Sequence, residues 1–247
     1  MTFNFIPVKT RVVRPPHDEI WDIIDGLEVM EGDVVFITSK ILGLHEGRTA
    51  RIEADGSAAE RQKEELIRRE ASSMLPFTQR AGFRSALTIT QNVLIPSAGI
   101  DESNADGYYV MWPSSPDELC REIRERLCGR LGLKNLGVVA TDSNVTPLRW
   151  GVTGIAIGLA GVEPLEDLRG KKDIFGRPMT VTPVSRIDAL TGMATLLMGE
   201  AADTKPIVIL RGYKEIVFNE KASMTDMKIA PEDDMYEPML KVLMKEY

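Results

Sequence analysis

The stretch GVVATDSN, residues 137–144, joins a compact apolar run to a cluster of polar side chains. The apolar run, extended by Leu136, predicts a buried strand over 136–141. We expect this strand to stop at Asp142, which leaves a carboxylate, a hydroxyl and an amide at its end. A second stretch, IPSAGIDESN at residues 95–104, similarly brings Asp101 to the end of an extended run.

These two acidic turns contain carboxylates and small hydroxyls but no histidine or cysteine. Hard cations such as Mg²⁺ and Mn²⁺ prefer such oxygen ligands, and in enzymes these ions often hold phosphates. Glu200 follows Gly199 at the end of a predicted helix and could join Asp101 and Asp142 around one or two such ions. The alternative interpretation is that Asp and Asn here only form turns, which is their commonest role.

The composition of the 247-residue chain is that of an ordinary globular protein, with 43% hydrophobic and 27% charged residues. A net charge of −7 without a basic block argues against a nucleic-acid surface. Cys120 and Cys128 fall on one predicted helix, about 12 Å apart, which is too far for a disulfide. We therefore expect a reducing, cytoplasmic setting, and no apolar stretch is long enough to span a membrane.

The pattern along the chain mixes helices and strands without a regular strand–helix–strand rhythm, which favours an α+β fold. Helices are predicted over 18–27, 58–73, 115–131, 186–197 and 231–247, and strands over 33–38, 87–94, 136–141, 180–183 and 206–210. Ser115 to Glu118 is interpreted as a capping box that opens its helix. We expect a single domain over 1–247, with 214–247 as a C-terminal helical extension.

Several common catalytic motifs are absent from the sequence. The segment 170–172 lacks the spacing of a phosphate-binding loop, and no nucleophilic serine motif is present. Gly154, Gly158 and Gly161 do not match a dinucleotide-binding fingerprint, so we interpret them as sites of tight packing against a sheet. Lys40, which follows the strand at 33–38, is a candidate phosphate partner or, alternatively, an ordinary surface lysine.

Five stretches occur in the order typical of one known family, and the likeness runs from about residue 6 to residue 213. They are GDVV (32–35) with EGR (46–48), AGID (98–101) with Ser103-Asn104, KDIFGR (172–177) and LLMGE (196–200). On these motifs the chain resembles the coenzyme F-420-0:gamma-glutamyl ligases, which build the glutamate tail of a deazaflavin coenzyme. Several separated matches in the correct order are more specific than any one of them.

The resemblance implies a distinctive α+β fold with largely antiparallel sheets and flanking helices, and an intertwined homodimer. It implies GTP as co-substrate, with ATP as the alternative, and Mg²⁺ or Mn²⁺ as the metal, with K⁺ as a further candidate cation. The implied substrates are glutamate and a small carboxylate acceptor. By position, the resemblance implies these metal ligands: Asp101, Asp142, Ser143 and Glu200. It implies these nucleotide contacts: Ser39, Lys40, Asn104 and the loop 198–203, which includes Met198, Gly199, Ala201 and Asp203.

The chain departs from the family at two places. The family usually has lysine at the position of Leu44, and a Gly-Arg pair where this chain has Val145-Thr146. The first departure leaves phosphate binding to Lys40 or another cation. The second suggests that the acceptor differs, because an arginine near a polyanionic acceptor has been lost.

We expect the acceptor carboxylate to attack the γ-phosphate of the nucleotide, and the amine of glutamate then to displace phosphate from the acyl phosphate. Asp101, Asp142, Glu200 and Lys40 would carry the chemistry, and Arg177 would either balance charge or form a structural ion pair. Two alternatives remain open: the same chemistry on a folate-like or other acceptor, and a non-catalytic nucleotide- or metal-binding relative.

Overall fold

A computed structural model describes residues 2–80 and 83–244 of the chain. Its largest sheet has six strands in the order β1-β14-β2-β10-β11-β15. All neighbouring strands in it are antiparallel except β2 and β10, which run parallel. The strands of this sheet are β1 (Asn4–Val8), β14 (Ile207–Arg211), β2 (Val34–Thr38), β10 (Gly137–Val145), β11 (Val152–Val162) and β15 (Phe218–Asn219).

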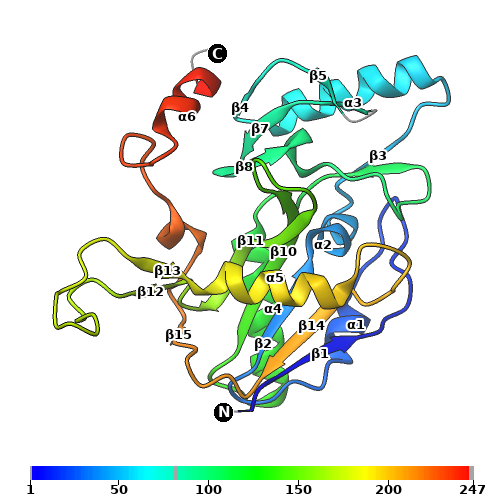
Figure 1. Cartoon of the computed structure of the whole chain (residues 1–247). Helices are drawn as coiled ribbons and strands as arrows, with labels where there is room; N and C mark the ends of the chain where they lie inside the picture. Colours follow the sequence, from blue (N-terminus) through cyan, green and yellow to red (C-terminus); the bar gives the residue numbers. More distant parts are fainter. Residues whose placement is uncertain (1, 81–82, 245–247) are drawn as a thin grey trace.

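Helices cover both faces of this sheet (Figure 1). The side chains of β2 alternate between the two faces, so Val35 and Ile37 pack with one set of helices while Val34 and Phe36 pack with α5. The helices on one face are α1 (Trp21–Asp25), α2 (Ser39–His45) and α4 (Pro116–Leu131), and α5 (Arg186–Met198) lies on the other. Two more helices, α3 (Gly56–Glu70) and α6 (Glu237–Met244), lie at the upper end in Figure 1. Short 3₁₀ turns form at η1 (Ser97–Gly99) and η2 (Met224–Met227).

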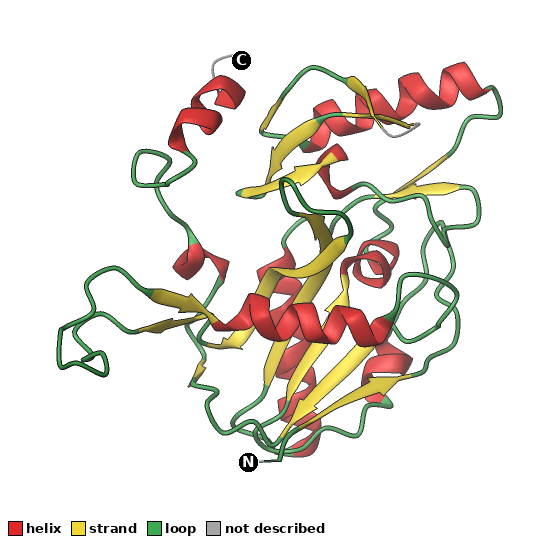
Figure 2. Cartoon of the chain, in the orientation of Figure 1, coloured by secondary structure: helices red, strands yellow, loops and turns green. Residues whose placement is uncertain are grey.

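In the described part of the chain, four small antiparallel sheets surround the main one, and Figure 2 shows most of them at its upper end, near α3. A third hydrophobic cluster, including Leu66, Ile67 and Met74, joins α3 to these strands. The small sheets are β3 (Thr49–Arg51) with β9 (Tyr108–Val110), β4 (Ser73–Met74) with β7 (Leu87–Thr90) and β8 (Val93–Pro96), β5 (Thr78–Arg80) with β6 (Phe83–Ser85), and β12 (Leu165–Asp167) with β13 (Pro183–Ser185).

The mixed α+β class with largely antiparallel sheets is confirmed. The helix predicted over 186–197 forms as α5, and the strand over 206–210 forms as β14. The helices predicted over 18–27 and 58–73 are shorter or shifted, as α1 and α3. In the C-terminal segment, α6 covers only part of the predicted helix 231–247, whose last three residues lie outside the described range.

Three local predictions are wrong. The strand over 87–94 is a hairpin, because Gln91 and Asn92 adopt positive φ values of 48° and 69° and reverse the chain between β7 and β8. The strand over 180–183 forms instead at 183–185. Ser115 is the N-cap of α4 but its side chain makes no capping hydrogen bond, so the predicted capping box does not form.

Gly154, Gly158 and Gly161 belong to β11, and the prediction of tight packing holds for them. A Cβ atom at Gly154 would lie 2.2 Å from Thr195 Oγ1, and one at Gly158 would lie 2.4 Å from Pro116 Cβ. The missing side chains therefore let α5 and α4 approach the two faces of this strand.

Among the described residues both cysteines are free, and burial raises the pKa of the Cys120 thiol.

Candidate functional site

A pocket of about 500 Å³ lies where the main sheet, α2 and the C-terminal end of α5 meet the segment 99–112. Every residue that the sequence analysis assigned to the metal or the nucleotide lines this pocket, although the residues come from four distant parts of the chain. They are Ser39, Lys40, Asp101, Asn104, Asp142, Ser143, Met198, Gly199, Glu200, Ala201 and Asp203. Their roles as ligands stay predictions, but their proximity is a property of the fold.

Lys40 enters the pocket from the first turn of α2 and pairs with Asp101. Its Nζ atom lies 2.7 Å from Asp101 Oδ2 and donates to the main-chain oxygen of Ser103 at 2.7 Å. Asp101 is fixed in turn by two backbone hydrogen bonds with Val110 and by donors from Ser103. The interpretation of Lys40 as a solvent-facing surface lysine is therefore wrong, because its side chain is only 20% exposed and faces a carboxylate.

Asp142 lies inside β10, not at its end as predicted, because the strand continues to Val145 and residues 141–145 pair with β11. Its position follows from a register shift between Ala140 and Thr141, where the regular pairing with β11 is interrupted. Trp112 donates its indole N–H to Asp142 Oδ2 at 2.5 Å. The sequence analysis did not identify Trp112, since nothing in its neighbourhood indicates a contact with a strand 30 residues away.

The two aspartates of the pocket have opposite pKa shifts. Burial raises the pKa of Asp142 to about 6, against the opposing effect of hydrogen bonds from Trp112, Ser143 and Ser39, and the nearby charge of Asp101 raises it further. Burial also acts to raise the pKa of Asp101, but the ion pair with Lys40 outweighs it and the pKa falls below its ordinary value. The pocket thus combines one carboxylate that is readily ionised with one that has no cationic partner among the described residues.

The other side of the pocket is formed by the loop that follows α5. Ser143 donates its hydroxyl to Glu200 Oε1 at 2.7 Å, which links β10 to this loop. Asn104 donates its side-chain amide to the main-chain oxygen of Ala201 at 3.1 Å, which links the loop to the segment carrying Asp101. Hydrogen bonds across the pocket thus join the predicted ligands to one another.

The donor set fits a hard divalent cation by its chemistry, since Asp101, Asp142, Ser143 and Glu200 offer only oxygen atoms. Within residues 2–80 and 83–244, no three His, Cys, Asp or Glu side chains come close enough to hold a metal ion by themselves. A cation held here would therefore need oxygens from a ligand in addition to those of the protein. Mg²⁺ usually binds in this way, through one or two carboxylates and the phosphates of a substrate.

Two other residues discussed from the sequence have clear places in the structure. Leu44, at the position where the family usually has lysine, is 1% exposed and lies at the edge of the pocket as part of the core. Arg177 does not line the pocket. It belongs to the loop between β12 and β13, which projects away from the body of the molecule in Figure 1, so this chain does not bring Arg177 to its own pocket.

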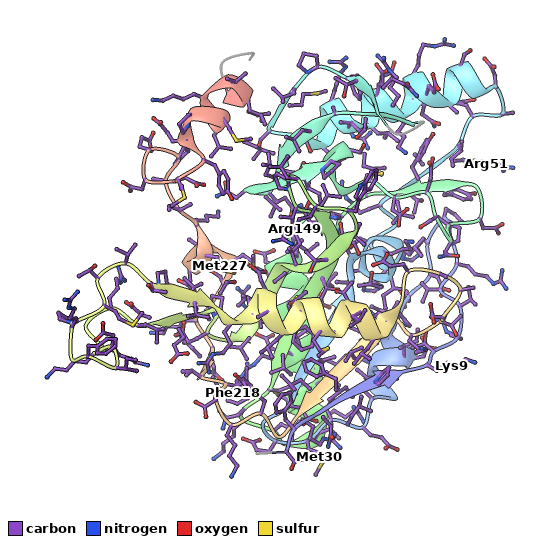
Figure 3. All side chains as sticks on the ribbon, viewed as in Figure 1. Lys9, Met30, Arg51, Arg149, Phe218 and Met227 are labelled. Atoms are coloured by element: carbon purple, nitrogen blue, oxygen red, sulfur yellow. The ribbon has the colours of Figure 1, made fainter. Side chains whose placement is uncertain are left out.

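Figure 3 shows Arg149 in the loop that joins β10 and β11. This loop directly follows the strand that carries Asp142 and Ser143, and the Val145-Thr146 departure from the family lies where the strand ends and the loop begins. In the described part of the chain, no helix has both the length and the apolar character needed to cross a membrane.

Comparison with known proteins identifies relatives along most of the chain. The family model for F420-0:gamma-glutamyl ligase matches residues 7–212. The chain is 36% identical to the coenzyme F420:L-glutamate ligase of Methanopyrus kandleri, over 85% of this chain and 86% of that protein. It is 32% identical to the enzymes of that name from Methanosarcina acetivorans and Archaeoglobus fulgidus, over 98–99% of each chain. The chain therefore belongs to the F420-0:gamma-glutamyl ligase family.

Proposed function

We propose that this protein is a coenzyme F420-type gamma-glutamyl ligase, which forms an amide between the amino group of glutamate and a carboxylate acceptor. Family membership over residues 7–212 supports the ligase activity. The observation that carries the proposal at the level of the site is the single pocket lined by Lys40, Asp101, Asp142 and Glu200. Its volume of about 500 Å³ is within the range of small-molecule sites.

The proposed reaction begins with activation of the acceptor by a purine nucleoside triphosphate, GTP or alternatively ATP. A carboxylate oxygen of the acceptor attacks the γ-phosphorus, and the bond to the nucleoside diphosphate breaks, which gives an acyl phosphate. The amine of glutamate then attacks the acyl carbon, phosphate leaves, and a proton is lost from nitrogen. Activation is needed because a free carboxylate is a poor electrophile.

The residues of the pocket would divide the work by charge. Lys40 would neutralise negative charge on the transferred phosphate, since its ammonium group already lies beside Asp101 inside the pocket. Asp101, Asp142, Ser143 and Glu200 would hold Mg²⁺ or Mn²⁺. When bound, such an ion neutralises charge on the phosphate oxygens. Ser39, Asn104 and the loop 198–203 would contact the nucleotide.

The chain is further proposed to act as a homodimer. The loop between β12 and β13 exposes the apolar side chains of Ile174 (92%) and Phe175 (83%), which a partner subunit would cover. A second copy would also offer a role for Arg177, which lies outside the pocket of its own chain.

The decisive assay measures release of GDP or ADP that depends on both acceptor and glutamate, with the amide product identified by mass spectrometry. We expect Asp142→Ala to abolish turnover, because it removes a carboxylate from the centre of the pocket. Asp233→Ala is the matched control, since Asp233 is an exposed carboxylate that does not line the pocket. Full turnover by Asp142→Ala in a folded protein would exclude the site.

The same assay separates the two alternatives. A folate-like or other acceptor is favoured if it supports nucleotide hydrolysis and amide formation while the F420-type acceptor does not. The Val145-Thr146 segment lies close to Ser143 in the chain, and this position is the observation that supports a different acceptor. A non-catalytic role is favoured if calorimetry detects metal-dependent nucleotide binding and no acceptor gives product.

A further inference from the structure

Trp112 forms part of the buried wall of the pocket. Its side chain is 2% exposed, and it follows β9 in the segment that carries Asp101 to the site. The indole N–H donates to Asp142 Oδ2 at 2.5 Å, so the ring links this segment to the middle of β10. A buried tryptophan usually satisfies its single N–H donor, but here the acceptor is a predicted metal ligand.

The backbone around Trp112 is arranged to admit the indole. Gly99 has φ +70°, and a Cβ atom there would lie 2.4 Å from both Nε1 and Cε2 of Trp112. The ring can therefore reach Asp142 only because position 99 has no side chain. At the other end, Arg48 Nε donates to the main-chain oxygen of Trp112 at 2.9 Å. Gly99 thus leaves space for the indole, and Arg48 fixes the backbone that carries it.

Ser39 and Ser143 line the same pocket as Asp142. The hydrogen bond from Trp112 ties the Asp142 carboxylate to a segment 30 residues away along the chain. An indole N–H can only donate, so in this structure it anchors one oxygen of Asp142. A merely structural tryptophan would not need to direct this donor at a pocket residue.

We propose that Trp112 is a positioning residue that holds the Asp142 carboxylate in the orientation required to bind the divalent cation of the nucleotide. The inference rests on the proposed function. In metal sites generally, groups that hydrogen-bond to a ligand orient it, and their loss weakens metal affinity or activity about 10- to 100-fold.

The first test replaces the ring while removing the donor. We expect Trp112→Phe to raise the Mn²⁺ concentration for half-maximal activation, or to lower kcat, by about 10- to 100-fold, with the KM for glutamate unchanged. Trp21→Phe is the matched control, because Trp21 packs against His45 outside the pocket. Gly99→Ala keeps the indole but displaces it, so it should produce the same pattern of defects as Trp112→Phe.

The second test needs no turnover. The variant Trp21→Phe/Trp150→Phe leaves Trp112 as the single tryptophan, so its fluorescence reports on the pocket alone. With a non-hydrolysable GTP analogue bound, we expect Mn²⁺, a paramagnetic ion, to quench this emission in a saturable way that excess Mg²⁺ reverses. Isothermal calorimetry with Mn²⁺ on the Trp112→Phe protein, with the same GTP analogue present, should then show the weaker metal binding directly.

The outcomes separate this inference from the proposed function. Wild-type Mn²⁺ affinity and kcat in either Trp112→Phe or Gly99→Ala would overturn the positioning role while leaving the ligase assignment intact. Absence of saturable quenching would also overturn it. If the wild-type protein makes no amide product but Mn²⁺ still quenches Trp112 and binds more weakly to Trp112→Phe, the positioning role stands and the ligase proposal fails.

Discussion

At the scale of single residues, the site is built on an electrostatic contrast between two aspartates. Asp101 has Lys40 as a cationic partner, whereas Asp142 has only neutral donors and lies near the charge of Asp101. Different environments thus push the pKa values of two similar groups apart, which is a common property of functional sites. A divalent cation would stabilise the ionised form of both groups.

This contrast predicts how the stability of the metal-free protein depends on pH. The folded-state pKa of Asp142, about 6, lies above its ordinary value of 3.8, so the folded protein binds a proton there that the unfolded chain has lost. The free energy of unfolding therefore falls as pH rises from about 4 to about 6. Relative to wild type, Asp142→Asn should gain about 1–3 kcal/mol between pH 4 and pH 7, as measured by urea unfolding in EDTA.

Asp101→Asn provides a control of opposite sign. The pKa of Asp101 is lowered in the folded wild-type protein, so ionised Asp101 stabilises the folded state at pH values above its ordinary pKa. That stabilisation is lost as the pH falls through the folded-state pKa. The variant should therefore lose stability relative to wild type as pH rises from 2.5 to 5. Parallel pH profiles for the two variants would contradict the assigned environments.

The sequence allowed the acidic residues of the site to be predicted better than their surroundings. Asp101, Asp142 and Glu200 could be chosen because carboxylates next to small residues are visible in the chain, although Asp142 proved to lie inside its strand. Trp112 could not, because its hydrogen bond depends on the approach of two segments that only the tertiary structure brings together. Residue type indicates the chemistry, whereas the supporting contacts are set by packing.

At the scale of secondary-structure elements, β11 shows how glycine shapes the layers of the fold. A Cβ atom at Gly158 would lie 2.4 Å from Pro116 Cβ and 2.7 Å from Pro116 C, both in the first turn of α4. Asp117 also accepts a hydrogen bond from the backbone of Leu159 at 2.8 Å, which ties the same turn to β11. The start of α4 therefore rests directly on the strand.

Replacement of Gly158 should force these elements apart. We expect Gly158→Ala to lower the free energy of unfolding by about 1–3 kcal/mol, because the atoms it meets belong largely to backbone that cannot rotate away. Gly129→Ala is the matched control: Gly129 lies within α4 in open space, and alanine there should raise stability by up to about 1 kcal/mol. Urea unfolding of both variants checks this. A Gly158→Ala protein as stable as wild type would show that α4 does not pack tightly against β11 at this position.

The elements also show where pattern-based prediction fails. The apolar run of α5 and the strand β14 were predicted nearly to the residue, because their patterns are long and bounded by glycine or proline. The segment 151–161 was not predicted as a strand, since its glycines dilute the alternation of side chains. The hairpin β7–β8 was missed because its turn residues, Gln91 and Asn92, are not the usual glycine pair.

At the scale of the whole molecule, the arm formed by β12, β13 and the loop between them stands apart from the layered body (Figure 1). The loop residues Ile174, Phe175 and Val181 are 92%, 83% and 78% exposed. Such exposed apolar groups on a projecting segment are typical of a surface that another protein covers. Because the arm is long and lies away from the pocket, a second copy of the chain is the partner that we propose.

This proposal predicts a concentration-dependent dimer that needs the arm. Sedimentation equilibrium should give twice the 27.4 kDa mass of the chain, and Ile174→Ser/Phe175→Ser should weaken the dimer at least roughly tenfold, since each tenfold step corresponds to only about 1.4 kcal/mol. Met30→Ser is the control, because Met30 is 54% exposed and, in Figure 3, lies far from the arm. A dimer of undiminished affinity in the arm variant would move the interface elsewhere, whereas a monomer at all concentrations would exclude the dimer. If the arm variant is monomeric and also loses turnover, while Met30→Ser keeps both properties, a residue of the arm such as Arg177 would have to act in the pocket of the partner subunit.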